Sequence, residues 1–169
     1  IAAGAGFAYL AAVGWYLSAG DVLLVLLDVF MLVMFGTALS SVINFFLSSQ
    51  GQISAVGSIV SSGYGFICGA YMPISSFGEG LQKVISFLPG TYGTSLLRNH
   101  AMRGAFEQMK DEGVPSDALE SFKDALDCNL YFFDKLVEVP VMYVIVGASV
   151  AVLVVAYVVM NYFKGKDTR

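Results

Sequence analysis

The residues that could carry enzymatic chemistry are few and scattered in this chain. His100 is the only histidine, and a lone loop histidine is most often a solvated side chain rather than a general base or metal ligand. Serines are numerous, but no histidine or lysine lies in the apolar segments to activate one as a nucleophile. The carboxylates between Glu107 and Glu138 form the pattern of a solvated acidic surface. No P-loop motif is present, so we expect no nucleotide hydrolysis. Together, these patterns predict no catalytic, cofactor-binding or metal-binding residue.

Four polar residues in an apolar stretch share one helix face. Thr37, Ser41, Asn44 and Ser48 fall within about 60° of one another at 100° per residue. Polar side chains inside a membrane either bond across helices or line a wet path. Both readings stay open, and the four residues are our candidates for a translocation path.

Small residues recur every four positions in the next apolar stretch, at Gly57, Ser61, Gly65 and Gly69. Such a ladder lets a second helix approach closely. The pattern therefore indicates helix packing.

Asp28 is the one acidic residue close in sequence to the polar stripe. On a helix it projects about 160° away from Asn44, so it does not belong to the stripe. Two roles fit its place near the outer end of its helix: an interfacial carboxylate that reaches the headgroups, or a proton relay. We favour the interfacial role.

The charged residues are distributed unevenly. Of 22 acidic and basic side chains, 16 lie between Glu79 and Glu138, four follow Phe163, and only Asp21 and Asp28 fall elsewhere. Three stretches carry no charge: 1–20, 29–78 and 139–163. The chain is 57% hydrophobic and 13% charged, whereas a soluble domain carries about 25% charged residues. It is therefore expected in a membrane, and its net charge of −4 argues against nucleic-acid binding.

A spanning helix needs about 20 apolar residues, so the uncharged stretches have room for one, two and one spans. We predict an all-α membrane protein with four transmembrane helices, three within 1–72 and one at its end: 2–19, 22–47, 53–72 and 140–163. Three basic residues in the tail 164–169 place the C-terminus in the cytoplasm by the positive-inside tendency. The segment 73–139 is then external.

The first part of the external loop 73–139 is still apolar. It predicts two helices, 77–88 and 91–102, separated by the break at Pro89-Gly90. Each is too short to cross a bilayer. The pair therefore suits a short re-entrant or interfacial hairpin.

The second part of the loop, 105–138, is polar and acidic. We predict a small external helical cap with a helix that starts at Pro115, and a stretch 130–137 that fits either strand or helix. Cys128 lies in this cap and Cys68 in the third span. A bond between them requires the cap to fold back on the membrane, and we favour free thiols over that pairing.

Several short motifs follow one another in a fixed order between residues 69 and 104. They are Gly69-Ala70-Tyr71-Met72-Pro73-Ile74-Ser75, the amphipathic stretch 81–88, Leu88-Pro89-Gly90-Thr91-Tyr92, and Leu97-Arg98. In order and spacing this region resembles the C-terminal region of type-2 ABC transporter permeases. There the penultimate span ends in a Gly-x-x-x-Pro-Ile-like turn, and a short amphipathic helix, a Pro-x-x-Tyr element and an Arg precede the last span. The flanking spans agree, whereas 105–138 resembles the family only weakly.

The resemblance implies that the four predicted spans are spans three to six and that Pro73 ends span five. It also implies that the helices 77–88 and 91–102 roof the translocation path. The candidate external gate residues are Pro73, Pro89, Gly90, Tyr92 and Arg98. The chain would then be the C-terminal part of a longer permease, with two more spans and a cytoplasmic coupling helix before it.

Family members pair as homodimers or heterodimers and work with a separate or fused ATPase, which holds ATP and Mg²⁺. The expected function is therefore the permease part of an ATP-driven exporter in the cell membrane, not itself an enzyme. It would move an amphipathic or lipid-like substrate, such as a drug, lipid, peptide or glycan, out of the cell by alternating access. The alternative is a non-transporting multi-pass anchoring or assembly protein whose external loop binds a partner. No residue of the sequence identifies the substrate.

Overall fold

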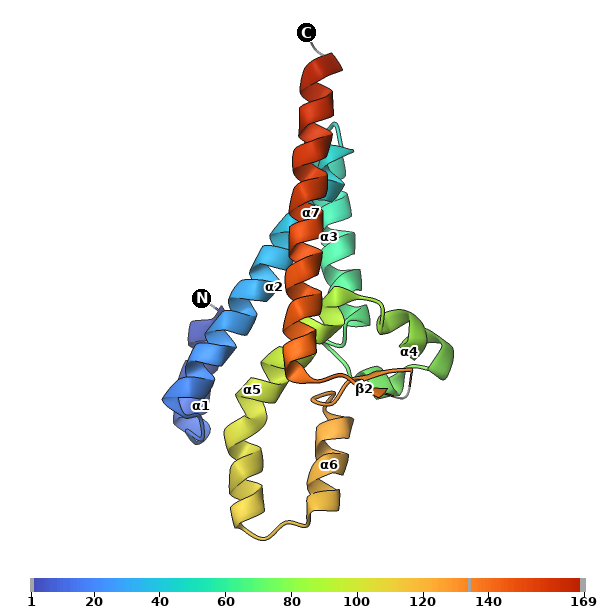
Figure 1. Cartoon of the computed structure of the whole chain (residues 1–169). Coiled ribbons are helices and arrows are strands. Elements are labelled where there is room, and N and C mark those ends of the chain that lie inside the picture. The colour runs from blue at the N-terminus through green and yellow to red at the C-terminus, as the bar shows by residue number, and fades with distance from the viewer. Residues whose placement is uncertain (1, 134, 168–169) are drawn as a thin grey trace.

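The computed structural model describes residues 2–133 and 135–167 and is mostly helical, at 77% (Figure 1). The elements follow in chain order: α1 Ala2–Val13, α2 Ala19–Phe45, α3 Gln50–Ile67, the 3-10 turn η1 Ile74–Ser76, α4 Glu79–Ile85, α5 Pro89–Asp111, α6 Ser116–Ala125, β1 Tyr131–Phe132, β2 Lys135–Leu136 and α7 Val139–Asp167. The helical class is as predicted, apart from the two short strands.

Helix α2 begins at a capping box, three residues before the predicted start. The Ser18 hydroxyl accepts a hydrogen bond from the Asp21 backbone N–H at 3.2 Å, and the Asp21 carboxylate accepts from the Ser18 N–H at 3.0 Å. Reciprocal bonds of this kind satisfy two backbone donors at a helix start. Gly20 and Asp21 are therefore not a link between spans but the first turn of α2.

Two helices within the described residues are long and apolar enough to cross a membrane. They are α2, with a mean hydropathy of 2.6, and α7 from Val139 to Lys164, with 2.5. Helix α1 has 12 residues, which rise only about 18 Å, so it is shorter than the predicted span 2–19 and shorter than a bilayer core. Two of the four predicted spans thus meet these criteria, and the four-span architecture stays a prediction.

Helix α3 has 18 residues and ends at Ile67, five residues before the predicted end of its span. The helix stops because Gly69 adopts a φ of +80°, the left-handed conformation that commonly follows a helix end. Pro73 therefore does not end this helix and lies beyond the turn. Serine, glycine and glutamine within α3 lower its hydropathy below that of α2 and α7.

The segment 73–139, which we predict to be external, has more helix than expected. Helix α4 lies within the predicted 77–88, but α5 runs on from the expected end at 102 to Asp111, into the segment assigned to the cap. Helix α6 follows Pro115 as predicted. The ambiguous stretch 130–137 forms two antiparallel strands in which Tyr131 faces Leu136.

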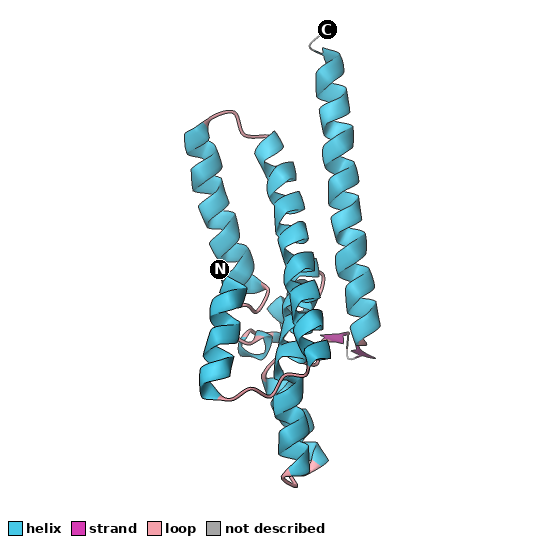
Figure 2. Ribbon diagram, turned by 90° about the vertical axis from the view of Figure 1, so that its left-hand side faces the viewer, coloured by secondary structure: helices cyan, strands magenta, loops and turns pink. Residues whose placement is uncertain are grey.

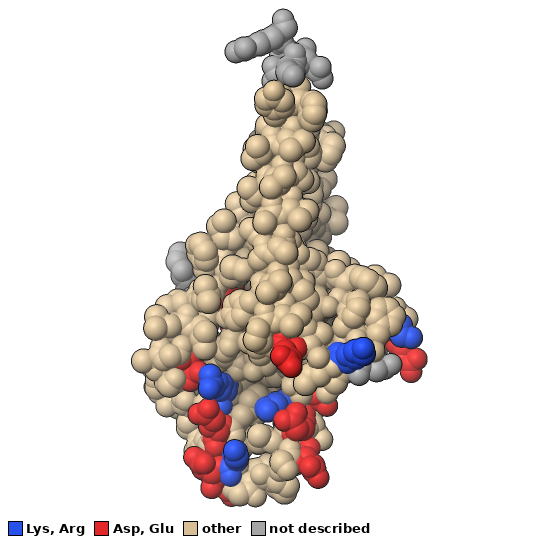
Figure 3. Space-filling model, in the orientation of Figure 1, with Lys and Arg blue, Asp and Glu red and all other residues tan. Residues whose placement is uncertain are grey.

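The arrangement separates a charged end from an apolar end. Helices α2, α5 and α7 pack against one another, and α7 runs past them to the C-terminal end (Figures 1 and 2). In the space-filling view the acidic and basic side chains gather around α4, α5, α6 and the loops in the lower half, while the tan part of the upper half shows none on this face (Figure 3). Large apolar side chains such as Phe30, Val33, Val144 and Val152 are more than half exposed on α2 and α7. Lipid contact accounts for this surface, because soluble proteins rarely expose such patches.

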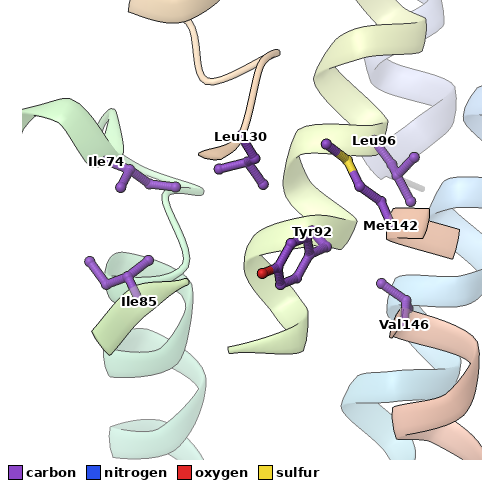
Figure 4. Close-up of a cluster of buried hydrophobic side chains, with 7 residues drawn as sticks. All are labelled: Ile74, Ile85, Tyr92, Leu96, Leu130, Met142 and Val146. Atoms are coloured by element: carbon purple, nitrogen blue, oxygen red, sulfur yellow. The ribbon is translucent and has the colours of Figure 1, made fainter. Parts of the chain in front are cut away.

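The buried core lies where the charged and apolar halves meet. One cluster joins the turn after α3, the hairpin α4–α5, the loop before β1 and the first turns of α7 (Figure 4). Its members are Ile74, Ile85, Tyr92, Leu96, Leu130, Met142 and Val146. Helix α5 stands at the centre of this cluster, so its position is fixed from several sides.

Two glycines let α5 approach the α2 region closely. A Cβ on Gly93 would lie 2.5 Å from the Leu32 side chain, and a Cβ on Gly104 would lie 1.7 Å from the Tyr16 carbonyl oxygen. The two glycines are eleven residues apart and therefore share one face of α5. The predicted helix ended at 102, but Gly104 lies inside α5, and its missing side chain is what allows the contact.

Replacing Gly104 with alanine should destabilise the fold by roughly 3 kcal/mol, the upper end of the usual cost of overpacking, because the clash is with backbone. Thermal unfolding of the purified protein measures this. Gly80→Ala is the matched control, since Gly80 lies in α4 with open space around it and should gain up to about 1 kcal/mol. Equal stability of G104A and wild type would show that the Tyr16 contact is not formed.

Candidate functional site

The hairpin between α4 and α5 is cross-linked by hydrogen bonds to backbone carbonyls. The Thr91 hydroxyl donates to the Ile85 carbonyl at 3.1 Å, and the Tyr92 hydroxyl donates to the Ser86 carbonyl at 2.5 Å. Thr91 and Tyr92 are both buried. The break at Pro89 is therefore a fixed corner in which α5 is held against the end of α4.

Gly90 brings the start of α5 against α3. Its N–H donates to the Tyr64 hydroxyl at 3.2 Å, and a Cβ here would lie 2.5 Å from the Tyr64 ring. Pro89 is the first residue of α5, where its missing N–H costs nothing. Of the candidate gate residues, Pro89, Gly90 and Tyr92 thus lie together at this corner.

Arg98 pairs with a carboxylate that the sequence did not single out. Its guanidinium lies 2.8 Å from the Asp127 carboxylate and also donates to the carbonyls of Gly69 and Leu126. Asp127 is buried and accepts a further bond from the Ile74 N–H at 2.7 Å. This ion pair joins the turn after α3, helix α5 and the loop after α6.

Pro73 follows the turn after α3 and directly precedes Ile74, whose N–H donates to the Asp127 carboxylate of this ion pair. All five candidate gate residues therefore belong to two neighbouring pieces of structure, the Pro89 corner and the Arg98 ion pair. Asp127 completes the second piece. Its signal in the sequence is weak, since it is one acidic residue among many in the cap.

The two cysteines are buried free thiols. Their backbone carbonyls accept hydrogen bonds from side chains of α5. The Thr94 hydroxyl donates to the Cys68 carbonyl at 2.7 Å, and the Asn99 amide donates to the Cys128 carbonyl at 2.8 Å. Burial raises the pKa of the Cys128 thiol to about 11. Cys128 is therefore protonated at neutral pH, and the favoured expectation of free thiols agrees with the structure.

Of the predicted polar stripe, α2 carries Thr37, Ser41 and Asn44, whereas Ser48 lies beyond the helix end at Phe45 and off the predicted face. Thr37, Asn44 and Ser48 are exposed, and the half-buried Ser41 donates its hydroxyl to the Thr37 carbonyl at 2.8 Å. The Ser48 backbone N–H donates to the Gln52 side chain of α3 at 3.2 Å. Their role in a path stays a prediction.

The small residues that recur along α3 make few contacts with other parts of the described structure. Nothing lies within 4 Å of a Cβ built on Gly57, and a Cβ on Gly65 would face the Tyr71 ring at 3.1 Å. Ser61 is exposed, and Gly69 lies beyond the helix end. Close packing of another helix on this ladder therefore stays a prediction.

Two apolar cavities adjoin the start of α5. One, of about 240 Å³, lies between α2, α3 and α5, and the other, of about 430 Å³, lies between α2, α3, the Pro89 corner and α7. Phe35 and Tyr64 line both, and their rings are 5.8 Å apart. No charged side chain lines either cavity, so both suit apolar groups.

The expectations for His100 and Asp28 were wrong. His100 is 6% exposed and Asp28 is 1% exposed, so the first is not solvated and the second does not reach the interface. The His100 Nδ1 lies 2.7 Å from one Asp28 oxygen, and the Tyr143 hydroxyl donates to the other at 2.5 Å. Local sequence could not bring these residues together, because they lie 72 and 115 positions apart.

Replacing Asp127 with alanine should destabilise the fold by about 3 kcal/mol, because it leaves the Arg98 guanidinium and the Ile74 N–H without their partner. The lower end of the range applies since the Arg98 side chain is 25% exposed. Thermal unfolding gives the value. Asp111→Ala, at an exposed site at the end of α5, is the control and should change little; a D127A protein as stable as this control would argue against the ion pair.

Comparison with known proteins gives one family. The family model for the ABC-2 type transporter matches residues 1–101, which include α1 to α4 and the first half of α5. Searches of curated proteins and of solved structures return no significant match. The matched region contains the Pro89 corner, Arg98 and the long apolar helix α2. The chain therefore belongs to the family of ABC-2 type transporters and is part of a membrane-spanning permease.

Proposed function

We propose that this chain is the C-terminal part of the permease of an ATP-driven exporter, with α4 and α5 as its external gate. The observation that carries the proposal is the Pro89 corner within the family match, where α5 starts against α3 beside two apolar cavities. A helix start placed at the end of such cavities closes them on the side of the charged loops. ATP and Mg²⁺ belong to a separate or fused ATPase.

The proposed topology has four crossings, with 73–139 outside and 164–169 inside. The separation of charge supports it, because the charged loops and the C-terminal end of α7 lie at opposite ends of the molecule (Figures 1 and 3). Helices α2 and α7 meet the length and hydropathy of a span. Helix α3 rises about 27 Å, close to the thickness of a bilayer core, so it crosses as part of a bundle.

The path lies between two permease copies in this proposal. Thr37, Asn44 and Ser48 point outward from a single chain, and exposed polar groups in lipid are unfavourable unless another chain or water meets them. A second copy or a homologous half facing α2 supplies that surface. The substrate class that fits is amphipathic, since the cavities are apolar and the stripe is polar but uncharged.

Alternating access then follows from two states of the bundle. When the ATPase subunits close, the paired helices rock and the cavity opens outward. Helix α5 moves together with its neighbours, because its Thr91, Thr94 and Asn99 side chains are bonded to the carbonyls of Ile85, Cys68 and Cys128.

Purification of the full permease from membranes tests the proposed function. A cytoplasmic ABC ATPase should co-purify, and vesicles that contain both should export an amphipathic dye when ATP is supplied. If an external protein co-purifies in place of an ATPase and no export occurs, the chain is an anchoring or assembly protein instead.

Replacing Asn44 with leucine tests the stripe. A hydrogen bond to a substrate or to water in the path contributes about 1 kcal/mol, so export should fall roughly fivefold while expression stays normal. The matched control is Asn161→Leu, because Asn161 is an exposed asparagine on α7 that bonds only to the Tyr157 carbonyl among the contacts described. Unchanged export by N44L would remove the stripe from the path.

A further inference from the structure

A carboxylate is buried where three helices meet. Asp28 lies in the first half of α2, is 1% exposed, and has both oxygens engaged, one with His100 of α5 and one with Tyr143 of α7. An ionised carboxylate in such a place is costly unless it is paired and hydrogen-bonded. The contact therefore binds α5 to both long apolar helices, and none of the proposed gate or path residues takes part in it.

His100 connects this buried contact to the outside. It lines a groove of about 760 Å³ between α5 and α6, together with charged residues of the external loop. Its Nδ1 is taken by Asp28, and its ring stacks on Tyr143 with the centroids 6.2 Å apart. A proton from the external solution thus reaches the imidazole through the groove, whereas the Asp28 carboxylate is buried and has no contact with solvent.

The charges around His100 come from three helices. On α2, Asp21 lies close enough to interact with His100 electrostatically, and it also lies 3.6 Å from Arg103 of α5. The other charged groups that line the groove are Glu107, Lys110, Glu120 and Lys123. Helix α7 contributes the Tyr143 hydroxyl. Glu107 and Glu120 are bonded to Arg103 and Lys123, so Asp28 is the carboxylate in direct contact with the ring.

We propose that Asp28, His100 and Tyr143 form a proton-sensitive contact, here called the latch, that positions α5 between α2 and α7. The proton reaches His100 from the external face. Histidine changes charge between about pH 5 and pH 8, and a charged imidazole bonds a carboxylate more strongly than a neutral one. The latch is therefore tighter at pH 6 than at pH 8. An effect of the latch on transport rests on the proposed role of α5 as gate. The latch itself depends only on the fold.

Hydrogen exchange of α5 measures the latch directly. In the full permease in lipid nanodiscs, amides of 97–104 should be about tenfold more protected at pH 6 than at pH 8, after correction for the intrinsic pH dependence of exchange. His100→Gln keeps a hydrogen-bonding side chain but does not titrate, so it should abolish the difference. Tyr143→Phe keeps the His100 contact with Asp28, so it should retain the pH difference at lower overall protection.

Lys110→Gln is the matched control, because Lys110 lines the same groove on the same helix and its variant should keep the wild-type pH profile. Asp28→Asn should lose the profile as His100→Gln does; if that variant does not fold, H100Q and Y143F decide. A tenfold difference that persists in H100Q, or its absence in wild type, overturns the proposal. Because the readout is protection and not export, a permease without export activity can still show the latch, and an active exporter can lack it.

Discussion

Helix α5 carries several buried polar side chains, and each of them has a hydrogen-bond partner on another element. Thr91, Ser95 and His100 are buried on this helix and bond to the Ile85 carbonyl, the Cys128 carbonyl and the Asp28 carboxylate. Among the described residues no buried side-chain nitrogen or oxygen lacks a hydrogen bond. Since an unpaired buried polar group costs several kcal/mol, these partners must be held in register, and the elements that supply them are held with them.

The same constraint applies to the proposed position of the start of α5 at the edge of a membrane. A segment that does not cross the bilayer must have its backbone ends satisfied by protein. Gly90 meets this demand through Tyr64, and the turn after α3 meets it through Asp127. On the proposed role of α5 as gate, α5 moves together with the elements bonded to it, because moving it alone would break bonds on three sides.

Close packing also holds α5 in place. Gly93 and Gly104 let α5 lie against Leu32 and Tyr16, and His100 falls between them on the same face. The small residues that matter for packing within this chain are therefore on α5. The regular ladder of α3 meets mostly open space, which suits a surface for another chain or for further spans of the permease.

The local features of the sequence predicted local structure well. The long apolar runs predicted α2 and α7, and Pro115 marked the start of α6. Predictions failed where distant residues decide. The predicted end of the second hairpin helix at 102 was wrong, because the sequence does not show which backbone packs on Gly104. The prediction of a solvated His100 was wrong, because a single histidine in a charged segment gives no sign of a partner 72 positions away.

By itself, the sequence determined that this is a membrane protein of a transporter family, which parts are apolar, and where the hairpin turns. These properties depend on composition and short motifs, which act over one or two helical turns. Only the tertiary structure decided the length and burial of α5, the pairing of Arg98 with Asp127, and the contact of Asp28 with His100 and Tyr143. Those depend on which helices pack together, because a buried charge or a missing side chain has a defined role only once its neighbours are in place.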